Sequence, residues 1–545
     1  MMRRNSTGFR AVRFAAVLAA VSVFAARPAS AGNFGSRGAR LDPRSTQARI
    51  SRSGTKPRVP RMVSATEAMK LVRGGNRVLM PTEAGASQML VNALVQRSQG
   101  LRGKKPVEVL HAASLIRYPQ HDTSKLRVNG LFINSGARSL VGKGLKVTPT
   151  YLSEIPKLLQ GELKPDVVLI KVSPPDKRGY VNTGASAGLI ADLVADPKVK
   201  VIAEVSPHVP RTRGETRLHQ SHIDAMVKSN EPMSELSWGK TSLVDMAIGR
   251  NVAREIGNGS TLQLGIGPLQ KAVGEQLAKR GKRINDKGGR FKVRLRTEMI
   301  DDGLVTMAKA GIISRSRDAV QLGFAVGSQK LYDFLAKDKR VKMVATSKIN
   351  DPALAGQRNK LVAVNSGVQV GLLNGGEVCS EAVPRRGPDG KIRPVQYSGV
   401  GGQVDFFRAV QRSKGGKGFL TLRSTARGGT VSSISLDLGS QVSLDGKKIK
   451  REHFESTLPT TTNRYDLDYV ATEWGVAKLK GKDLVGRAQA LVTVAHPRFR
   501  SYLAQQGQAA LGGDAGGWKD AAKVTKRELR MARFFDASER VLEGK

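Results

Sequence analysis

Cysteine is nearly absent from this chain of 545 residues, which contains a single one, Cys379. One cysteine cannot form an intramolecular disulfide, so nothing indicates an oxidising compartment. We expect Cys379 to be a small apolar filler, with a reactive thiol as the alternative. The seven histidines are scattered, and neither H-E-x-x-H nor a cysteine-rich zinc spacing occurs. We therefore expect no metal site.

Aromatic and acidic residues are also scarce. Aromatic residues make up 5% of the chain, and 45 acidic residues face 90 Lys and Arg, which gives a net charge of +45. Such a charge attracts polyanions in general, including a phosphate-rich small ligand. A platform for single-stranded nucleic acid would need more aromatic side chains, and no long block of Lys and Arg is present. We expect a basic solvated surface and no nucleic-acid partner.

The chain lacks an apolar run long enough for a comfortable membrane span. The run at residues 14–26 has thirteen residues, follows a basic segment, and precedes an A-x-A pattern at residues 29–31, as in a secretory signal peptide. Residues 32–61 are rich in Arg, Ser and Gly and poor in acid, which is typical of an organelle transit peptide. We expect residues 1–61 to be a targeting or disordered segment, and no membrane span in the mature form.

Helical and strand-like patterns alternate from residue 64 onward. Continuous apolar runs between helical stretches are typical of the strands of a parallel sheet that is covered on both faces; they lie at residues 77–80, 107–111, 167–172, 199–205, 261–264, 341–346, 361–364 and 419–422. The pattern predicts the α/β class. We expect one α/β domain at residues 62–250, a second at residues 251–505, and a flexible tail with one candidate helix at residues 506–545.

Two glycine-containing turns could hold an anion. In the first, a strand runs into a helix, so that free N–H groups face a phosphate or a developing oxyanion; its residues are Gly265, Ile266, Gly267, Pro268 and Leu269. It lacks the third glycine of a dinucleotide fingerprint, and the Walker pattern is absent. The second turn has three glycines, Gly399, Gly401 and Gly402. A purely structural turn is the alternative in both cases.

A carboxylate lies near the end of another expected strand. Glu298 belongs to the sequence Arg-Thr-Glu-Met-Ile-Asp-Asp-Gly at residues 296–303. A carboxylate beside a turn at a strand end could act as a nucleophile. A surface or capping glutamate is the alternative, and the residues alone leave the choice open.

Together and in this order, these three segments resemble the acetyl-CoA hydrolase/transferase family, which includes acetate, succinate, butyrate and 4-hydroxybutyrate CoA-transferases. Four further segments match the family: residues 172–180 its SPPD…GY turn, residues 203–212 its AEVNPxxPRT segment, and residues 468–477 and 495–500 its C-terminal close. The resemblance extends over about residues 62–503.

The resemblance implies a fold of two CoA-transferase-type α/β domains with the active site between them. It implies that Glu298 is the covalent nucleophile and that CoA and the thioester oxygen are held by Gly265, Ile266, Gly267, Pro268, Leu269, Gly399, Gly401 and Gly402, with Lys417 as a further contact to CoA. It implies acyl-CoA and a short-chain carboxylate as substrates, no permanently bound cofactor, and a homodimer as the candidate assembly. This chain departs from the family at Arg296, where His or Tyr is usual, and at Cys379, where Asn is usual.

On this resemblance, the protein moves CoA between acetyl-CoA, or another short-chain acyl-CoA, and a carboxylate such as succinate or acetate. The reaction would pass through a glutamyl-CoA thioester. An acetyl-CoA hydrolase and a non-catalytic basic binding protein are the alternatives. Since an enzyme of CoA thioesters has no substrate outside the cell, we expect a mitochondrial location, with another organelle or the periplasm as alternatives.

Overall fold

The computed structural model describes residues 59–80, 84–101, 105–194 and 196–542. The expected targeting segment, residues 1–61, therefore lies outside the described residues except for its last three. Within the described ranges, no helix combines the length and the apolar composition that crossing a membrane requires.

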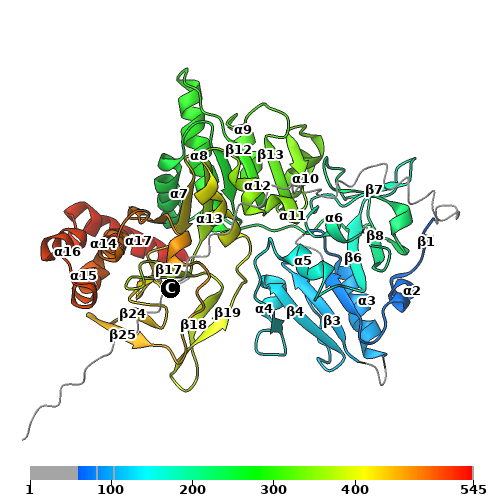
Figure 1. The fold of residues 1–545 in the computed structure, drawn as a ribbon, viewed down its shortest axis with the longest axis horizontal. Helices are drawn as coiled ribbons and strands as arrows, with labels where there is room; N and C mark the ends of the chain where they lie inside the picture. Colours follow the sequence, from blue (N-terminus) through cyan, green and yellow to red (C-terminus); the bar gives the residue numbers. More distant parts are fainter. Residues whose placement is uncertain (1–58, 81–83, 102–104, 195, 543–545) are drawn as a thin grey trace, which may run out of the picture. The chain divides into compact units, whose positions relative to one another are not determined.

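The first half of the chain forms an eight-stranded sheet whose neighbouring strands are all parallel (Figure 1). In spatial order the strands are β1 (Arg61–Met62), β10 (Ala225–Lys228), β8 (Lys200–Val205), β6 (Val167–Val172), β2 (Arg77–Met80), β3 (Val107–Ala112), β4 (Leu126–Phe132) and β5 (Lys146–Val147). The helices of this half are α2 (Ala65–Ala68), α3 (Gln88–Gln99), α4 (Ser135–Arg138), α5 (Ile155–Gln160) and α6 (Ile190–Leu193). A separate antiparallel pair joins β7 (Tyr180–Asn182) to β9 (Arg217–His219).

The second half forms another eight-stranded sheet, parallel except for its last pair of strands. In spatial order the strands are β14 (Val341–Met343), β13 (Val320–Ala325), β12 (Arg294–Ile300), β11 (Thr261–Leu264), β15 (Leu361–Ser366), β20 (Lys417–Thr421), β26 (Tyr469–Thr472) and β27 (Gly475–Lys478). Its helices are α7 (Leu243–Glu255), α8 (Pro268–Asp286), α9 (Gly303–Lys309), α10 (Gln329–Lys337), α11 (Thr346–Ile349), α12 (Pro352–Gly356), α13 (Gln403–Arg412) and α14 (Leu484–Val494).

Small sheets complete the second half. One joins β17 (Glu377–Cys379), β16 (Gln369–Gly371) and β23 (Ile434–Ser435), another joins β18 (Ala382–Arg386) and β19 (Ile392–Gln396), and a third joins β21 (Thr425–Ala426), β22 (Val431–Ser432), β24 (Ser440–Asp445) and β25 (Lys448–His453). Cys379 is fully buried in a small apolar cluster, as expected of a filler.

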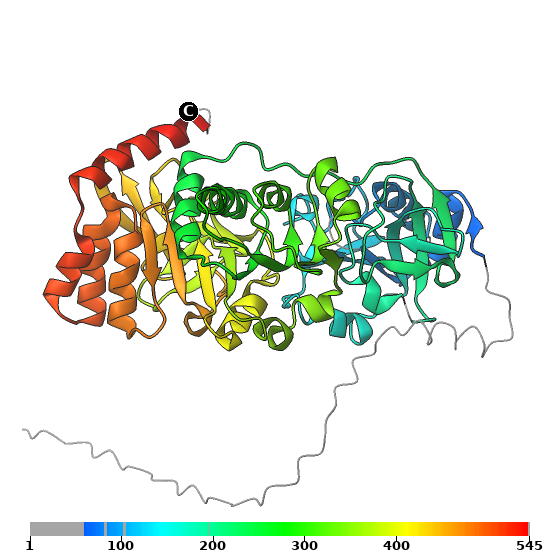
Figure 2. The ribbon, with the colours of Figure 1, turned by 90° about the horizontal axis from the view of Figure 1, so that it is seen from above.

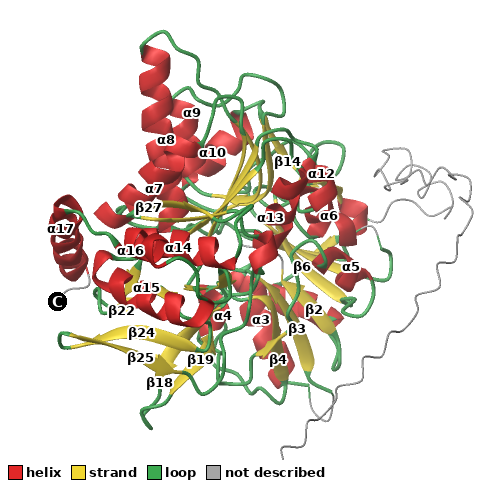
Figure 3. Cartoon of the chain, turned by 60° about the vertical axis from the view of Figure 1, so that its left-hand side comes forward, coloured by secondary structure: helices red, strands yellow, loops and turns green. Residues whose placement is uncertain are grey.

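Both large sheets bury both of their faces, which is why their strands are continuously apolar. On β6, Val168 and Ile170 pack into one apolar cluster while Val167 and Leu169 pack into another. Helices lie on either side of the strands (Figure 3). The predicted α/β class with parallel sheets is confirmed.

The division between the halves lies earlier than the predicted boundary at 250/251. That boundary falls inside α7, whose Val252 and Ala253 pack into the apolar core of the second sheet. Helix α7 therefore belongs to the second half.

The candidate helix within the predicted tail, residues 506–545, is present, but the described part of that segment is folded against the domain rather than flexible. The chain forms α15 (Pro497–Leu511), α16 (Ala515–Ala522) and α17 (Lys526–Leu542), which lie together at the red end of the chain (Figure 2). Trp518 on α16 is 1% exposed and packs in the core with Phe499 and Leu503 of α15. Burying an indole of this size fixes the segment against the domain.

Candidate active site

Glu298 lies near the carboxyl end of β12 and is only 6% exposed. Its Oε2 accepts a hydrogen bond of 2.6 Å from Nδ2 of Asn350, the residue that follows α11. The same amide nitrogen lies 3.3 Å from Oδ2 of Asp405, in the first turn of α13. One buried asparagine thus bridges two buried carboxylates.

The first half of the chain supplies the other partners of Asp405. The Ser153 backbone N–H donates to Oδ2 of Asp405 at 3.0 Å, and the Ser153 hydroxyl donates to Oδ1 at 2.7 Å. The neighbouring Leu152 N–H donates to the Gly401 carbonyl at 3.0 Å. The surroundings of Glu298 are therefore completed by residues from both halves.

Burial dominates the electrostatics of Glu298. The pKa of Glu298 is raised to about 7, mainly by burial and also by the charge of Asp405, while hydrogen bonds from Asn350 and the Gly402 backbone oppose the shift. Burial likewise raises the pKa of Asp405 to about 6, against hydrogen bonds from Ser153 and Asn350. A carboxylate that is buried without a cationic partner is poorly solvated and is correspondingly more reactive as a nucleophile.

Gly402 is required by the position of the Glu298 carboxylate. A Cβ atom at residue 402 would lie 1.7 Å from Glu298 Oε2 and 2.4 Å from Asn350 Nδ2. Gly402 is also the N-cap of α13, so that the positive end of this helix faces the carboxylate. The glycine loop expected at residues 399–402 thus touches the expected nucleophile.

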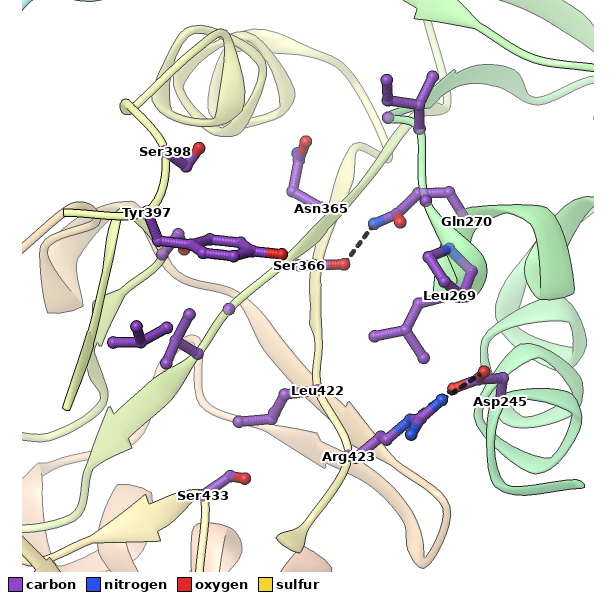
Figure 4. A pocket seen from close by; sticks show the side chains of 18 of the residues that line it. Asp245, Leu269, Gln270, Asn365, Ser366, Tyr397, Ser398, Leu422, Arg423 and Ser433 are labelled. Atoms are coloured by element: carbon purple, nitrogen blue, oxygen red, sulfur yellow. Dashed lines mark hydrogen bonds and ion pairs between the residues drawn. The ribbon is translucent and has the colours of Figure 1, made fainter. Parts of the chain in front are cut away.

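The other predicted loop, residues 265–269, leads from β11 into α8. Gly267, the N-cap of α8, has a φ of +127°, a conformation that favours glycine. Beside this loop, the amide of Gln270 hydrogen-bonds the Ser366 hydroxyl at 2.7 Å, and both side chains face the cavity (Figure 4). Asn365, on the same strand as Ser366, is held by Gln263 at 3.1 Å.

A cavity of about 840 Å³ joins these elements. Its walls include Glu298 and every residue predicted in the two glycine loops, namely Gly265, Ile266, Gly267, Pro268, Leu269, Gly399, Gly401 and Gly402. Phe132 and Asn134 from the first half also line it. The volume suits a large ligand.

Lys417, for which the resemblance implied a contact with CoA, does not line this cavity. Lys417 begins β20, whereas the cavity lies at the carboxyl ends of the strands, where Leu422 and Arg423 follow β20. Its Nζ donates to the backbone oxygen and to the carboxylate of Glu255, each at 3.1 Å. Its side chain therefore lies at the opposite edge of the sheet from the cavity.

Sequence reasoning missed several polar residues of the cavity and its surroundings. Asn350, Asp405 and Ser153 belong to no glycine-rich or repeated pattern. Arg423 and Asp245 form a two-pronged ion pair in the cavity wall, at 2.9 and 2.8 Å (Figure 4). The arginine fork is a group that suits phosphate or carboxylate recognition.

The C-terminal helix forms another part of the wall. Phe535 and Asp536 of α17 line the cavity beside His496. His496 is 2% exposed, and its Nε2 lies 3.5 Å from Oδ1 of Asp536. Arg498 pairs with the other oxygen of Asp536 at 2.8 Å. The predicted tail therefore contributes directly to this cavity.

The sequence also contains the G-x-S-x-G pattern of serine hydrolases, at residues 184–188. Its Ser186 is 0% exposed and forms a β-bridge with Phe324 of the second sheet. A nucleophile elbow needs an exposed hydroxyl. This serine is therefore structural. Among the described residues, no cluster of three His, Cys, Asp or Glu could hold a metal ion.

Comparison with known families gives two matches along the chain. The N-terminal domain of the acetyl-CoA hydrolase/transferase family matches residues 48–236, and its C-terminal domain matches residues 327–507. The first match begins inside the predicted targeting segment. Glu298 lies between the two matches, and α17 lies beyond the second.

Individual proteins match over most of the chain. The 4-hydroxybutyrate coenzyme A transferase of Clostridium kluyveri is 36% identical, over 81% of this chain and 96% of its own. The succinyl-CoA:cyclohexane-1-carboxylate CoA transferase of Geobacter metallireducens is 32% identical, over 82% and 94%. The solved structure of RipA from Yersinia pestis is 25% identical with a TM-score of 0.67, over 82% and 96%. The chain belongs to the acetyl-CoA hydrolase/transferase family.

Proposed function

We propose that the protein is a coenzyme A transferase and that Glu298 is its nucleophile. The observation that carries the proposal is the position of Glu298: its buried carboxylate lies on the wall of a cavity that both glycine loops line. The relatives from Clostridium kluyveri and Geobacter metallireducens are named as CoA transferases, which supports CoA transfer as the reaction. Their names support a carboxylic acid as the acceptor.

The proposed reaction begins with attack of a Glu298 carboxylate oxygen on the thioester carbonyl carbon. The C–S bond breaks, CoA leaves as its thiolate, and an acyl-glutamyl anhydride remains. The thiolate then attacks the glutamyl carbonyl and expels the acyl group as a free carboxylate, which leaves a glutamyl-CoA thioester. An acceptor carboxylate attacks this thioester, and the same steps in reverse release the new acyl-CoA. Each bond to the acyl group is replaced by one of similar activation, so no other energy source is consumed.

The residues around Glu298 suit each step. Each attack forms an oxyanion, and one aligned donor stabilises such a charge by about 2.7–4 kcal/mol. The N–H groups of both glycine loops border the cavity and are candidates for this role. Asn350 holds Oε2 of Glu298, which makes Oε1 the candidate attacking oxygen. The pKa of about 7 lets the carboxylate be present near neutral pH.

Trapping tests the proposal directly. Incubation with acetyl-CoA followed by borohydride should reduce a glutamyl thioester at Glu298, which peptide mass spectrometry locates. Glu298→Gln should give no reduced peptide. Asp301→Asn, which replaces another buried carboxylate directly after β12, should still give it. Reduction of any other carboxylate, or equal labelling of Glu298→Gln, would refute the assignment.

An isotope-exchange assay distinguishes CoA transfer from hydrolysis. Labelled acetate that exchanges into acetyl-CoA in the presence of enzyme indicates transfer, whereas acetate release without exchange indicates an acetyl-CoA hydrolase. Both reactions use the first two steps, and they differ in whether water reaches the glutamyl thioester. We expect exchange to exceed release, with succinate and 4-hydroxybutyrate tested as further acceptors.

We also propose a mitochondrial location, on the basis of the arginine-rich, acid-poor composition of residues 1–61. Fusion of these residues to a fluorescent protein should direct it to mitochondria. Delivery to another organelle or to the cell exterior would refute this part of the proposal and leave the catalytic part intact.

A further inference from the structure

A second cavity, of about 400 Å³, lies on the outer strands of the second sheet. Its lining shares no residue with that of the first cavity. Four of the residues that line it are basic and none is acidic: Arg296, Lys342, Lys348 and Arg358. The cavity is therefore a concentration of positive charge that the proposed CoA-transfer reaction does not use.

Strand register explains how the basic residues meet. Arg296 on β12 is the register partner of Gln321 on β13, and Gln321 is the register partner of Lys342 on β14. Register partners on neighbouring parallel strands project from the same face of the sheet, about 4.8 Å apart. The three side chains form a polar row across one face. Lys348 on α11 and Arg358 after α12 complete the lining.

Arg296 forms the buried floor of this cavity, since its side chain is only 7% exposed. Its Nη1 donates to Gln321 at 2.7 Å, and its Nη2 donates to the backbone carbonyl of Lys348. Its Nε is buried and has no hydrogen-bond partner in the part of the chain that the structure describes. A buried guanidinium N–H without an acceptor is costly, so the protein satisfies the guanidinium of Arg296 incompletely.

The charges in this cavity are poorly compensated. The pKa of Arg296 is lowered to about 10, mainly by burial and also by the nearby charge of Arg358, while the charge of Asp351 partly opposes both. Lys348 is paired with Glu215. Within the four described ranges, no carboxylate forms an ion pair with Arg296, Lys342 or Arg358. Lys342 and Arg358, which have no ion-pair partner among the described residues, and the weakly compensated Arg296 give the cavity an excess of positive charge, which favours an anion with several charges.

We propose that this cavity binds a compact oligophosphate, free or as part of a nucleotide. The Arg358 guanidinium presents a planar fork that matches phosphate oxygens, and the Lys342 ammonium adds a point charge. Arg296 and Lys348, which are bonded to other groups of the protein, add positive charge to the lining. The cavity is large enough for a pyrophosphate group with its hydration. The site is separate from the CoA cavity, although Arg296 and Glu298 lie two residues apart on the same strand.

Isothermal titration of the full-length protein with inorganic pyrophosphate tests this proposal. Saturating CoA is present throughout, so that the first cavity is occupied. We expect one bound pyrophosphate per chain, and at least tenfold weaker binding to the double variant Lys342→Gln/Arg358→Gln. Both residues lie at the rim and outside the proposed catalytic machinery, so CoA transfer should stay unchanged. The matched control is Lys279→Gln/Arg283→Gln on the exposed face of α8, which removes the same charge and should bind within twofold of the wild type.

Several outcomes would overturn the proposal. They are absence of binding by the wild type at millimolar pyrophosphate, equal weakening in both double variants, and tighter binding of citrate than of pyrophosphate. Equal weakening would mean that the chain's overall charge attracts the anion. ADP as a second titrant distinguishes the two sources of phosphate: tighter binding of ADP than of pyrophosphate indicates a nucleotide, and weaker binding indicates the free anion.

Discussion

The two large sheets each bury a glutamate on a central strand, and the surroundings of the two glutamates differ in one respect. In the first sheet, Glu204 on β8 is 1% exposed and pairs with Lys171, its register partner on β6, at 3.1 Å. In the second sheet, Glu298 on β12 is 6% exposed, and its nearest described partners are the amide of Asn350 and a second acid, Asp405. Burial is the same, but only one charge is neutralised.

This difference separates a structural carboxylate from a reactive one. In a buried ion pair the two charges already neutralise each other, so binding of a ligand adds little stabilisation. A buried carboxylate beside a neutral donor keeps an unfavourable charge, which a bond to an electrophile removes. Four predictions test whether the contrast holds, in decreasing order of expected effect.

Glu298→Gln should have the largest effect, a loss of at least about 10³-fold in the rate of CoA exchange, because the attacking oxygen is replaced by an amide. Folding stability should stay the same or rise, since a buried unpaired carboxylate is removed. Exchange kinetics and urea denaturation measure the two quantities. Retention of a tenth of the activity would mean that Glu298 is as structural as Glu204.

Lys171→Met should reduce stability and leave activity nearly unchanged, the reverse of Glu298→Gln. It leaves Glu204 buried without its cation, and the expected loss is about 3–5 kcal/mol of unfolding free energy. The rate per folded molecule should stay within a few-fold of the wild type. The control is the double variant Lys171→Met/Glu204→Gln, which should recover most of the stability. A loss below about 1 kcal/mol in the single variant would show that the pair is effectively solvated.

The stability of the wild type relative to Glu298→Gln should depend on pH. Glu298 has its pKa raised from 4.5 to about 7, so the folded state holds a proton that the unfolded state has released between these values. The unfolding free energy of the wild type relative to Glu298→Gln is therefore highest below pH 4.5. It falls by about 3 kcal/mol as the pH rises through 7.

Activity should change with pH in the other direction. The value of kcat/KM should increase toward neutral pH, because the ionised carboxylate is the nucleophile. Urea denaturation of both proteins at a series of pH values, together with kcat/KM profiles, checks this prediction. A stability difference between the two proteins that is flat from pH 4.5 to 7.5 would mean that Glu298 is solvated like a surface acid.

Much of the fold can be predicted from the sequence because parallel strands buried on both faces are continuous apolar runs. The runs at residues 167–172 and 261–264 coincide with β6 and β11. The sequence does not predict that the C-terminal segment packs against the domain, because its anchor is a single large side chain, Trp518, after a glycine-rich stretch. Local composition there resembles a linker, and only tertiary packing shows otherwise.

The residues of the candidate site also include some that the sequence predicts and some that it does not. Its glycine loops have local patterns, whereas Asn350, Asp405 and Ser153 are single polar residues that meet only in the folded chain. Ser153 and Asp405 are 252 positions apart. Lys417 shows a different case, because the family resemblance implied a contact with CoA, whereas the direction of β20 places the residue at the opposite edge of the sheet.

Ser153→Ala should have the smallest effect, because it weakens the link between the halves without removing a charge. Asp405 loses the 2.7 Å hydroxyl bond and keeps the 3.0 Å bond from the Ser153 backbone. We expect a loss of about 1 kcal/mol in unfolding free energy, measured by urea denaturation. The pKa of Asp405 should rise, because a bond that lowers it is lost.

A less ionised Asp405 repels the Glu298 carboxylate less, so the acid limb of the kcat/KM profile should move to lower pH, by less than about one unit. The matched control is Ser139→Ala, at an exposed serine of the first half that lies outside the cavity lining. It removes the same hydroxyl group and should leave the profile unchanged. A shift to higher pH in Ser153→Ala would mean that Asp405 does not act on Glu298 through its charge, and the contrast between the two buried glutamates would then depend on Asn350 alone.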